Sequence, residues 1–108
     1  MPAPRHTLEI DYKIQHRDEP FSHSTGKNIT LSGMRLFVPE EFSLGTILEL
    51  VVRFCGYSKA LDAVAEVIWC KKSEEKTNYY EMGLKFIDID FSKFTEFLLD
   101  CAAKEKKE

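Results

Sequence analysis

Apolar and polar residues alternate at period two through much of this sequence. The clearest example is residues 8–15, where polar residues separate four apolar ones: Leu8, Ile10, Tyr12 and Ile14. In an extended strand, this period places all the apolar side chains on one face. A chain that repeats such segments between turns is expected to form an antiparallel sheet with one buried face.

Five further segments are typical of strands. We predict strands over residues 28–31 and 34–38 on either side of a tight turn at Ser32-Gly33, and then over 46–54, 63–70 and 80–86. The segment from His16 to His23 is mostly polar and contains Pro20, which argues against a continuous strand. We therefore interpret it as a connection.

The period changes to that of a helix after residue 90. The apolar residues are now spaced three or four apart along one stripe: Phe91, Phe94, Phe97, Leu98 and Cys101. Asp90 is a candidate N-cap, since its side chain can accept a hydrogen bond from the first helical turn. We expect a helix over about 91–103 that packs its stripe into the core, rather than presenting it to a partner, and a frayed tail over 104–108.

Six strands followed by one helix predict an all-β-dominated fold. Closing the sheet into an antiparallel β-barrel would remove the exposed edges that an open sheet must protect. We predict one domain over residues 1–108, with a six-stranded barrel over about 7–88, the C-terminal helix and flexible ends. The length of 108 residues and the hydrophobic fraction of 44% are usual for a single domain with a real core.

Charge and hydropathy exclude several classes of function. A net charge of -3 argues against a general nucleic-acid binder, but it is compatible with a small anionic ligand held by a few cations. No apolar run is long enough to span a bilayer, and the N-terminus lacks a signal sequence, so we expect a cytoplasmic protein without direct membrane insertion. Cys55, Cys70 and Cys101 are expected to be buried free thiols.

The sequence offers no catalytic or metal-binding constellation. His6, His16 and His23 have no paired ligand spacing, so we expect exposed histidines and no metal. No nucleophile is accompanied by a credible base, and no pair of carboxylates stands out. We therefore expect neither an enzyme nor a resident cofactor.

The most promising polar patch combines Arg5 with the segment around Asn28. An arginine can grip a phosphate bidentately or engage guanine, while the side chains of Asn28 and Thr30 can satisfy a base edge. Gly33 would allow the backbone to take a positive φ in the turn. The alternative is that Asn28 and Thr30 only shape a β-turn and that Arg5 is free in solvent; the pattern alone leaves both open.

The segment Asn28-Ile29-Thr30-Leu31-Ser32-Gly33 resembles the Asp/Asn-x-Ser-x-x-Gly half of the PilZ domain signature, with Thr30 keeping a hydroxyl at the serine position. Met34-Arg35-Leu36, residues 66–69 and 82–86, and the closing helix also resemble the family in the same order. The resemblance covers nearly the whole chain. It implies a PilZ-like β-barrel that binds the bacterial messenger cyclic di-GMP.

The resemblance also implies roles for individual residues. Arg5 would hold a phosphate or guanine, Asn28 and Thr30 would contact a base, and Gly33 would let the backbone turn beneath it; Arg35 is a further candidate. Ligand binding would order the N-terminal arm and so signal to a protein partner or a fused domain in bacterial signalling or motility.

The other half of the signature, Arg-x-x-x-Arg, is incomplete. Arg5 fits the second arginine, and Met1 then stands at the position of the first. Either the chain begins just inside the motif, or it belongs to a member that has lost one ligand arm. Two alternatives stay open: a PilZ-like interaction module in pilus or motility regulation that does not bind nucleotide, and an oligonucleotide-binding barrel, which the acidic balance disfavours.

Overall fold

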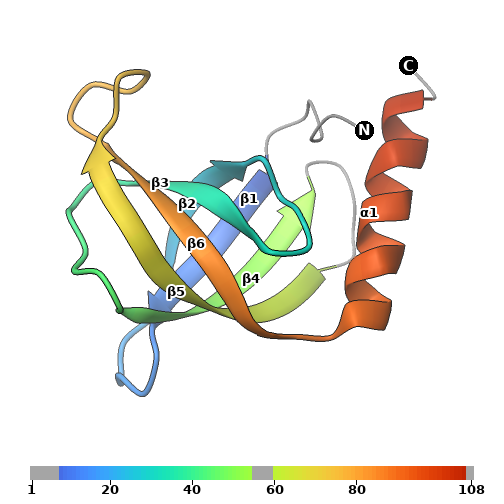
Figure 1. Ribbon diagram of the computed structural model, residues 1–108, viewed down its shortest axis with the longest axis horizontal. Coiled ribbons are helices and arrows are strands. Elements are labelled where there is room, and N and C mark those ends of the chain that lie inside the picture. Colours follow the sequence, from blue (N-terminus) through green and yellow to red (C-terminus); the bar gives the residue numbers. More distant parts are fainter. Residues whose placement is uncertain (1–7, 55–59, 107–108) are drawn as a thin grey trace.

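Six antiparallel strands form a closed barrel, and one helix stands beside it (Figure 1). The computed structural model describes residues 8–54 and 60–106, and the side chains of these except Phe54 and 101–106. The elements are β1 (Leu8–Ile14), β2 (Ser22–Lys27), β3 (Gly33–Val38), β4 (Ile47–Phe54), β5 (Ala60–Lys72), β6 (Tyr80–Ile89) and α1 (Phe91–Lys106). The order of strands around the barrel is β1-β2-β3-β6-β5-β4. The predicted fold is therefore confirmed.

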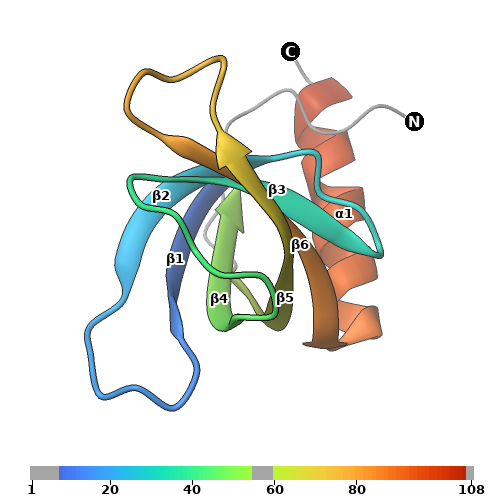
Figure 2. The ribbon, with the colours of Figure 1, turned by 60° about the vertical axis from the view of Figure 1, so that its left-hand side comes forward.

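The alternating pattern sets the register between β1 and β4. Tyr12 pairs with Leu50 and Ile14 with Leu48, so the apolar positions of both strands face inward together. Ile10 and Val52, which are opposite each other, are both fully buried. A slip of one residue would turn every one of these side chains to solvent, so burial strongly specifies the pairing. Figure 2 shows β4 between β1 and β5, as barrel closure requires.

β2 lies earlier in the chain than predicted. The polar segment expected to be only a connection contains β2 over Ser22–Lys27, whereas residues 28–31, expected to be a strand, lie in the loop before β3. The reason is that β2 contributes small residues to the interior: Ser24 faces Ile10 and Gly26 faces Leu8. A Cβ at Gly26 would stand 2.5 Å from the Met34 side chain. Small residues opposite large ones fill a narrow barrel but leave no apolar alternation to detect.

The helix packs on the barrel through Phe94 and Phe97, but not through Phe91, which was predicted to belong to the same buried stripe. Phe94 is fully buried and Phe97 nearly so, and the rings of Phe94 and Phe86 meet edge to face with centroids 5.8 Å apart. Phe91, expected in the buried stripe, is instead 65% exposed, because the buried face of α1 centres on Phe94 and Phe97. The Lys93 amide donates to the Asp90 carboxylate over 3.1 Å, so the predicted N-cap is confirmed.

The remaining predictions about the fold concern the two ends of the chain and insertion into a membrane. The helix continues to Lys106 instead of ending near 103, and the predicted flexible N-terminal end lies outside the described residues. Within the described part of the chain, α1 is neither long nor apolar enough to cross a membrane.

Candidate functional site

The loop between β2 and β3 and the first residues of β3 hold most of the residues singled out from the sequence. Asn28 has a left-handed backbone with φ of 56°, a conformation that Asn adopts more readily than other non-glycine residues. The Thr30 amide donates to the Gly33 carbonyl over 2.8 Å and closes the turn. Ile29 is buried and anchors the loop to the core. Polar side chains are thus presented from a loop whose backbone is held at both ends.

Gly33 is needed for a different reason from the one expected. It begins β3 and does not have a positive φ, so the predicted left-handed turn at this position is wrong. The backbone of β6 crosses so closely that a Cβ at Gly33 would lie 1.8 Å from the Leu84 carbonyl oxygen. The Phe86 amide donates to the Ser32 carbonyl over 2.9 Å at the same crossing. Glycine therefore allows the loop to sit directly against β6.

An open groove of about 410 Å³ runs beside this loop. We call it the motif groove, and its main lining residues are Asn28, Thr30, Gly33, Arg35, Trp69 and Lys85. It therefore unites Asn28, Thr30, Gly33 and Arg35, which were predicted as site residues, with side chains from β5 and β6. Arg5, the fifth predicted residue, lies outside the described residues. The volume is within the usual range of small-molecule sites, roughly 300–1,000 Å³.

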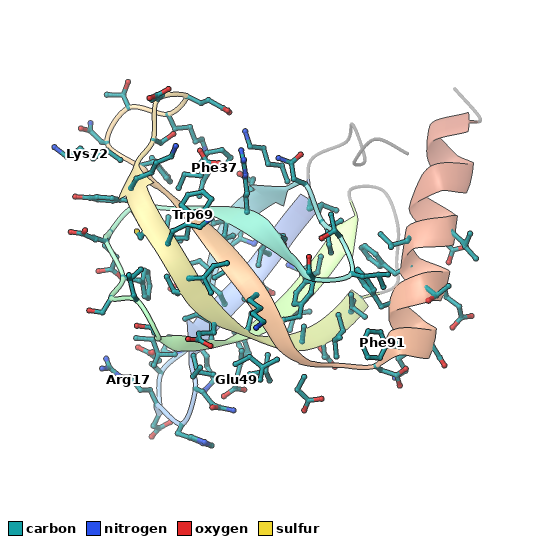
Figure 3. The ribbon with its side chains drawn as sticks, viewed as in Figure 1. Arg17, Phe37, Glu49, Trp69, Lys72 and Phe91 are labelled. Carbon is teal, nitrogen blue, oxygen red and sulfur yellow. The ribbon has the colours of Figure 1, made fainter. Side chains whose placement is uncertain are left out.

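Trp69 provides an aromatic wall of the motif groove that sequence reasoning missed. It is partly exposed and pairs with Gly83 across β5 and β6. A Cβ at Gly83 would stand 2.1 Å from the Trp69 ring nitrogen, so the indole lies directly over the glycine backbone. Figure 3 shows Trp69 on the outside of these strands. The signal in the sequence was a Trp opposite a Gly, but it is visible only once the register of the two strands is known.

Cationic side chains surround the Trp69 ring. The Arg35 guanidinium lies 5.8 Å from the ring centroid. The ammonium of Lys71, which is on the same strand as Trp69, lies 5.6 Å from this centroid. Arg35 also donates to the Glu81 carboxylate over 3.2 Å; the Glu81 side chain is 7% exposed, whereas that of Arg35 is 47% exposed. Arg35 is thus oriented from beneath by a buried anion and still open to the groove. Such an arrangement suits a planar, negatively charged ligand.

The hairpin between β5 and β6 is tied to the strands next to the motif groove. Lys27 of β2 forms an ion pair with Glu75 at 2.5 Å, and Lys27 lowers the pKa of the Glu75 carboxyl. Lys27 and Lys76 both lie over the Phe37 ring, at 5.2 and 5.7 Å from its centroid. The surface around the motif groove is therefore cationic and aromatic, although the whole chain is acidic.

The remaining candidates from the sequence do not form a site. No group of three or more His, Cys, Asp or Glu side chains within residues 8–54 and 60–100 could hold a metal ion. His23 is exposed, as expected, and interacts with Asp11 at 2.9 Å. Cys70 is a free thiol that is only partly buried, while the thiols of Cys55 and Cys101 lie outside the described side chains.

Comparison with protein families agrees with the loop motif. The model of the PilZ domain matches residues 2–99, which is nearly the whole chain. The chain belongs to the PilZ domain family. The match spans the loop from Asn28 to Gly33 and the first half of α1. No curated protein matches this PilZ domain significantly in sequence.

Among solved structures, this PilZ domain is similar to the Bacillus subtilis inhibitor of motility MotI/DgrA. The TM-score is 0.76 with 14% sequence identity, and the match covers 99% of this chain and 51% of the other. The chain thus spans about half the length of MotI/DgrA. At this identity the similarity shows a common fold.

Proposed function

We propose that this PilZ domain is a receptor for cyclic di-GMP that acts by binding and not by catalysis. The observation that carries the proposal is the motif groove, in which the side chains of Asn28 and Thr30 stand beside an aromatic face and an oriented arginine. Membership of the PilZ family supports this ligand, since the family resemblance implies it. The cationic surroundings of the groove favour an anionic ligand despite the net charge of -3.

The groove offers a distinct contact to each part of the ligand. One guanine would stack on the Trp69 ring, since every base has a π face and a partly exposed indole can serve as a stacking platform. Asn28 would form a hydrogen bond with a base edge. Arg35 would bind a phosphate while it continues to donate a hydrogen bond to Glu81. Arg5 would close over the ligand from the N-terminal arm, and ordering of that arm would be the signal to a partner protein or fused domain.

The same proposal includes the cellular role. MotI/DgrA is described as an inhibitor of motility, and we propose that this PilZ domain likewise acts in cytoplasmic bacterial signalling that controls motility. The alternative is an interaction module that has kept the barrel but binds no nucleotide. These two functions predict opposite results in a ligand titration.

Fluorescence and calorimetric titration with cyclic di-GMP distinguish them. Trp69 is the only tryptophan in the sequence, so its emission reports directly on the motif groove. Binding should change Trp69 emission and release heat with the same saturation curve, whereas GMP at equal concentration should do neither. Absence of both signals at micromolar cyclic di-GMP would contradict the receptor proposal and favour the interaction module.

Matched arginine variants make this test specific. We expect Arg5→Ala and Arg35→Ala each to weaken binding by roughly fivefold to a hundredfold, since a good bidentate arginine contact is worth about 1–3 kcal/mol. Arg17→Ala removes the same charge from the loop between β1 and β2, which lies far from Trp69 (Figure 3), and should leave the affinity unchanged. Equal losses in all three variants would indicate a general charge effect instead of a site.

A further inference from the structure

A second groove lies on the outside of the barrel, away from the motif groove, where β4, β5 and the end of β6 run side by side. We call it the acidic groove; its volume is about 240 Å³, and it is lined chiefly by Glu49, Val51, Asp62, Val64, Asp88 and Asp90. None of these residues lines the motif groove. In Figure 3, Trp69 lies in the upper part of the view and Glu49 at the bottom.

Strand register makes the floor of the acidic groove apolar and its walls acidic. Val51 pairs with Asp62 across β4 and β5, and Val64 pairs with Asp88 across β5 and β6. Each valine is only partly buried and has a carboxylate directly beside it on the neighbouring strand. Phe21, which is 45% exposed, adds an aromatic side chain from the loop before β2.

Two of the carboxylates have no cationic partner among the described residues. Glu49 is paired with Lys13 at 3.2 Å, and Asp90 caps the helix by accepting from the Lys93 amide. Asp62 and Asp88, in contrast, are exposed and make no ion pair with any of the described residues. The barrel thus presents uncompensated negative charge directly beside partly exposed apolar side chains.

Two exposed apolar side chains flank the groove residues of β6 in the sequence. Ile87 and Phe91, which come directly before Asp88 and after Asp90 in the sequence, are 54% and 65% exposed. Figure 3 shows Phe91 at the start of α1, next to the end of β6. Large apolar side chains that cluster on a surface within a polar rim are typical of protein interfaces.

Size and charge define the occupant. The volume is below the roughly 300–1,000 Å³ of small-molecule sites, so the groove suits one or two anchoring side chains of a larger partner. Carboxylates repel both anionic phospholipid and nucleic-acid phosphate, which leaves a protein segment whose cations complement Asp62 and Asp88. We propose that the acidic groove docks a basic amphipathic segment of a partner protein, with an apolar side chain over Val51 and Val64 and Lys or Arg beside the two aspartates.

The test uses a defined probe, a short amphipathic peptide of Leu and Lys, and the isotopically labelled chain without nucleotide. We expect the amide chemical shifts to change at 49–51, 62–64 and 88–90. The matched peptide in which Glu replaces every Lys should leave these shifts unchanged. Absence of shifts with the Leu/Lys peptide, or shifts centred on residues outside the acidic groove, would overturn the proposal.

Charge variants distinguish peptide docking in the acidic groove from general electrostatic attraction between the basic peptide and the acidic chain. The double variant Asp62→Asn/Asp88→Asn should weaken peptide binding by roughly tenfold, since exposed pairs contribute up to about 1 kcal/mol each. The control Glu74→Gln/Glu96→Gln removes the same charge from the hairpin and from α1, outside the groove, and should bind like the wild type. An equal loss in the control would overturn the proposal.

Two further measurements separate the other occupants. Sedimentation that shows a dimer, broken by Asp62→Asn/Asp88→Asn, would assign the groove to a second copy of this chain and overturn the proposal; we expect a monomer. Binding to vesicles that contain anionic phospholipid, reduced by the same variant, would also contradict it. The proposal is independent of cyclic di-GMP binding, because the double variant should bind the nucleotide like the wild type.

Discussion

At the scale of single residues, two glycines shape the motif groove through close approach. The added Cβ would meet the backbone carbonyl of Leu84 at Gly33 but the indole of Trp69 at Gly83. A backbone group of β6 cannot move without breaking the hydrogen-bond ladder, whereas a partly exposed indole can rotate outward. The two positions should therefore respond differently to the same substitution.

We predict that Gly33→Ala is the more destabilising of the two variants. Overpacking a buried crossing costs about 1–3 kcal/mol or more, and we expect Gly33→Ala to lie at the upper end of this range. Gly83→Ala should lose less stability but shift the Trp69 emission spectrum, because the ring must leave its position. Urea unfolding followed by circular dichroism, with fluorescence recorded separately, measures both effects. Equal stability losses and an unchanged emission spectrum would contradict this account.

The Arg35–Glu81 pair links the stability of the barrel to the motif groove. Arg35→Ala leaves the Glu81 carboxylate, 7% exposed, without its cation, which should cost roughly 1–3 kcal/mol of unfolding free energy. Glu81→Gln in the same chain should restore part of this loss, because a neutral amide is easier to bury than a carboxylate. A double-mutant cycle by urea unfolding measures the coupling. If Glu81→Gln restores nothing, the ion pair does not account for the cost.

At the scale of elements, the start of α1 depends on one side chain. Asp90→Ala removes the acceptor of the Lys93 amide and should cost about 1 kcal/mol, whereas Asp90→Asn keeps a capping oxygen and should cost much less. Thermal or urea unfolding of the two variants checks this difference. Similar losses in both would mean that the charge of Asp90, and not its capping oxygen, stabilises the helix.

Three strands are joined by a charged network that predicts a dependence on pH. Asp11 of β1 accepts from Arg53 of β4 at 2.9 Å and lies 2.9 Å from His23 of β2. The hydrogen bond from Arg53, followed by that from His23, holds the pKa of the Asp11 carboxyl below its usual value of 3.8. A lowered pKa in the folded state means that this stabilisation is complete above about pH 4 and is lost as the pH falls below it.

The matching experiment is acid unfolding of Asp11→Asn. The wild type should lose up to about 1 kcal/mol more than the variant as the pH falls below about 4, since the network is partly exposed and screened by solvent. Lys13→Gln, which alters a neighbouring ion pair on β1, serves as the control and should keep the acid sensitivity of the wild type. Parallel curves for the wild type and Asp11→Asn would exclude Asp11 as the source.

At the scale of the whole molecule, charge is divided between two surfaces of the barrel, which lie at different positions along β5 and β6. Near the motif groove, cationic side chains gather with aromatic rings: Lys27, Arg35, Lys71 and Lys76. In the acidic groove, Asp62 and Asp88 have no ion-pair partner in the described part of the chain. The net charge of -3 averages over these two surfaces and so describes neither. One side is suited to an anionic ligand and the other to a basic partner.

We expect added salt to weaken both proposed interactions, but through the charges of different residues. Raising ionic strength should weaken cyclic di-GMP binding and peptide docking alike, because exposed charges are screened over about 10 Å at 0.1 M salt. The Asp62→Asn/Asp88→Asn variant should lose the salt dependence of peptide docking while keeping that of nucleotide binding. Titrations at two salt concentrations measure this, and a variant that loses both dependences would contradict the separation of the two surfaces.

The sequence alone determined most of the strands, the helix and its cap, and it singled out the polar residues of the segment from Asn28 to Gly33, although it placed a strand over 28–31. These follow from local periodicity and local hydrogen bonding, which a short segment carries by itself. It failed at β2, whose inward residues Ser24 and Gly26 have no apolar pattern, and at Phe91, whose exposure depends on how α1 docks. In both cases burial is set by packing against other elements, which the periodicity of the segment itself does not contain.

Only the tertiary structure showed what stands beside the polar loop. Trp69 and Arg35 reach the motif groove because the register of β3, β6 and β5 aligns them over Gly83, and Asp62 flanks Val51 because of the register of β4 and β5. The role of Gly33 likewise comes from the crossing of β6 and not from its own backbone angles. Registers between distant strands depend on the packing of the whole core, so a single segment of sequence does not contain them.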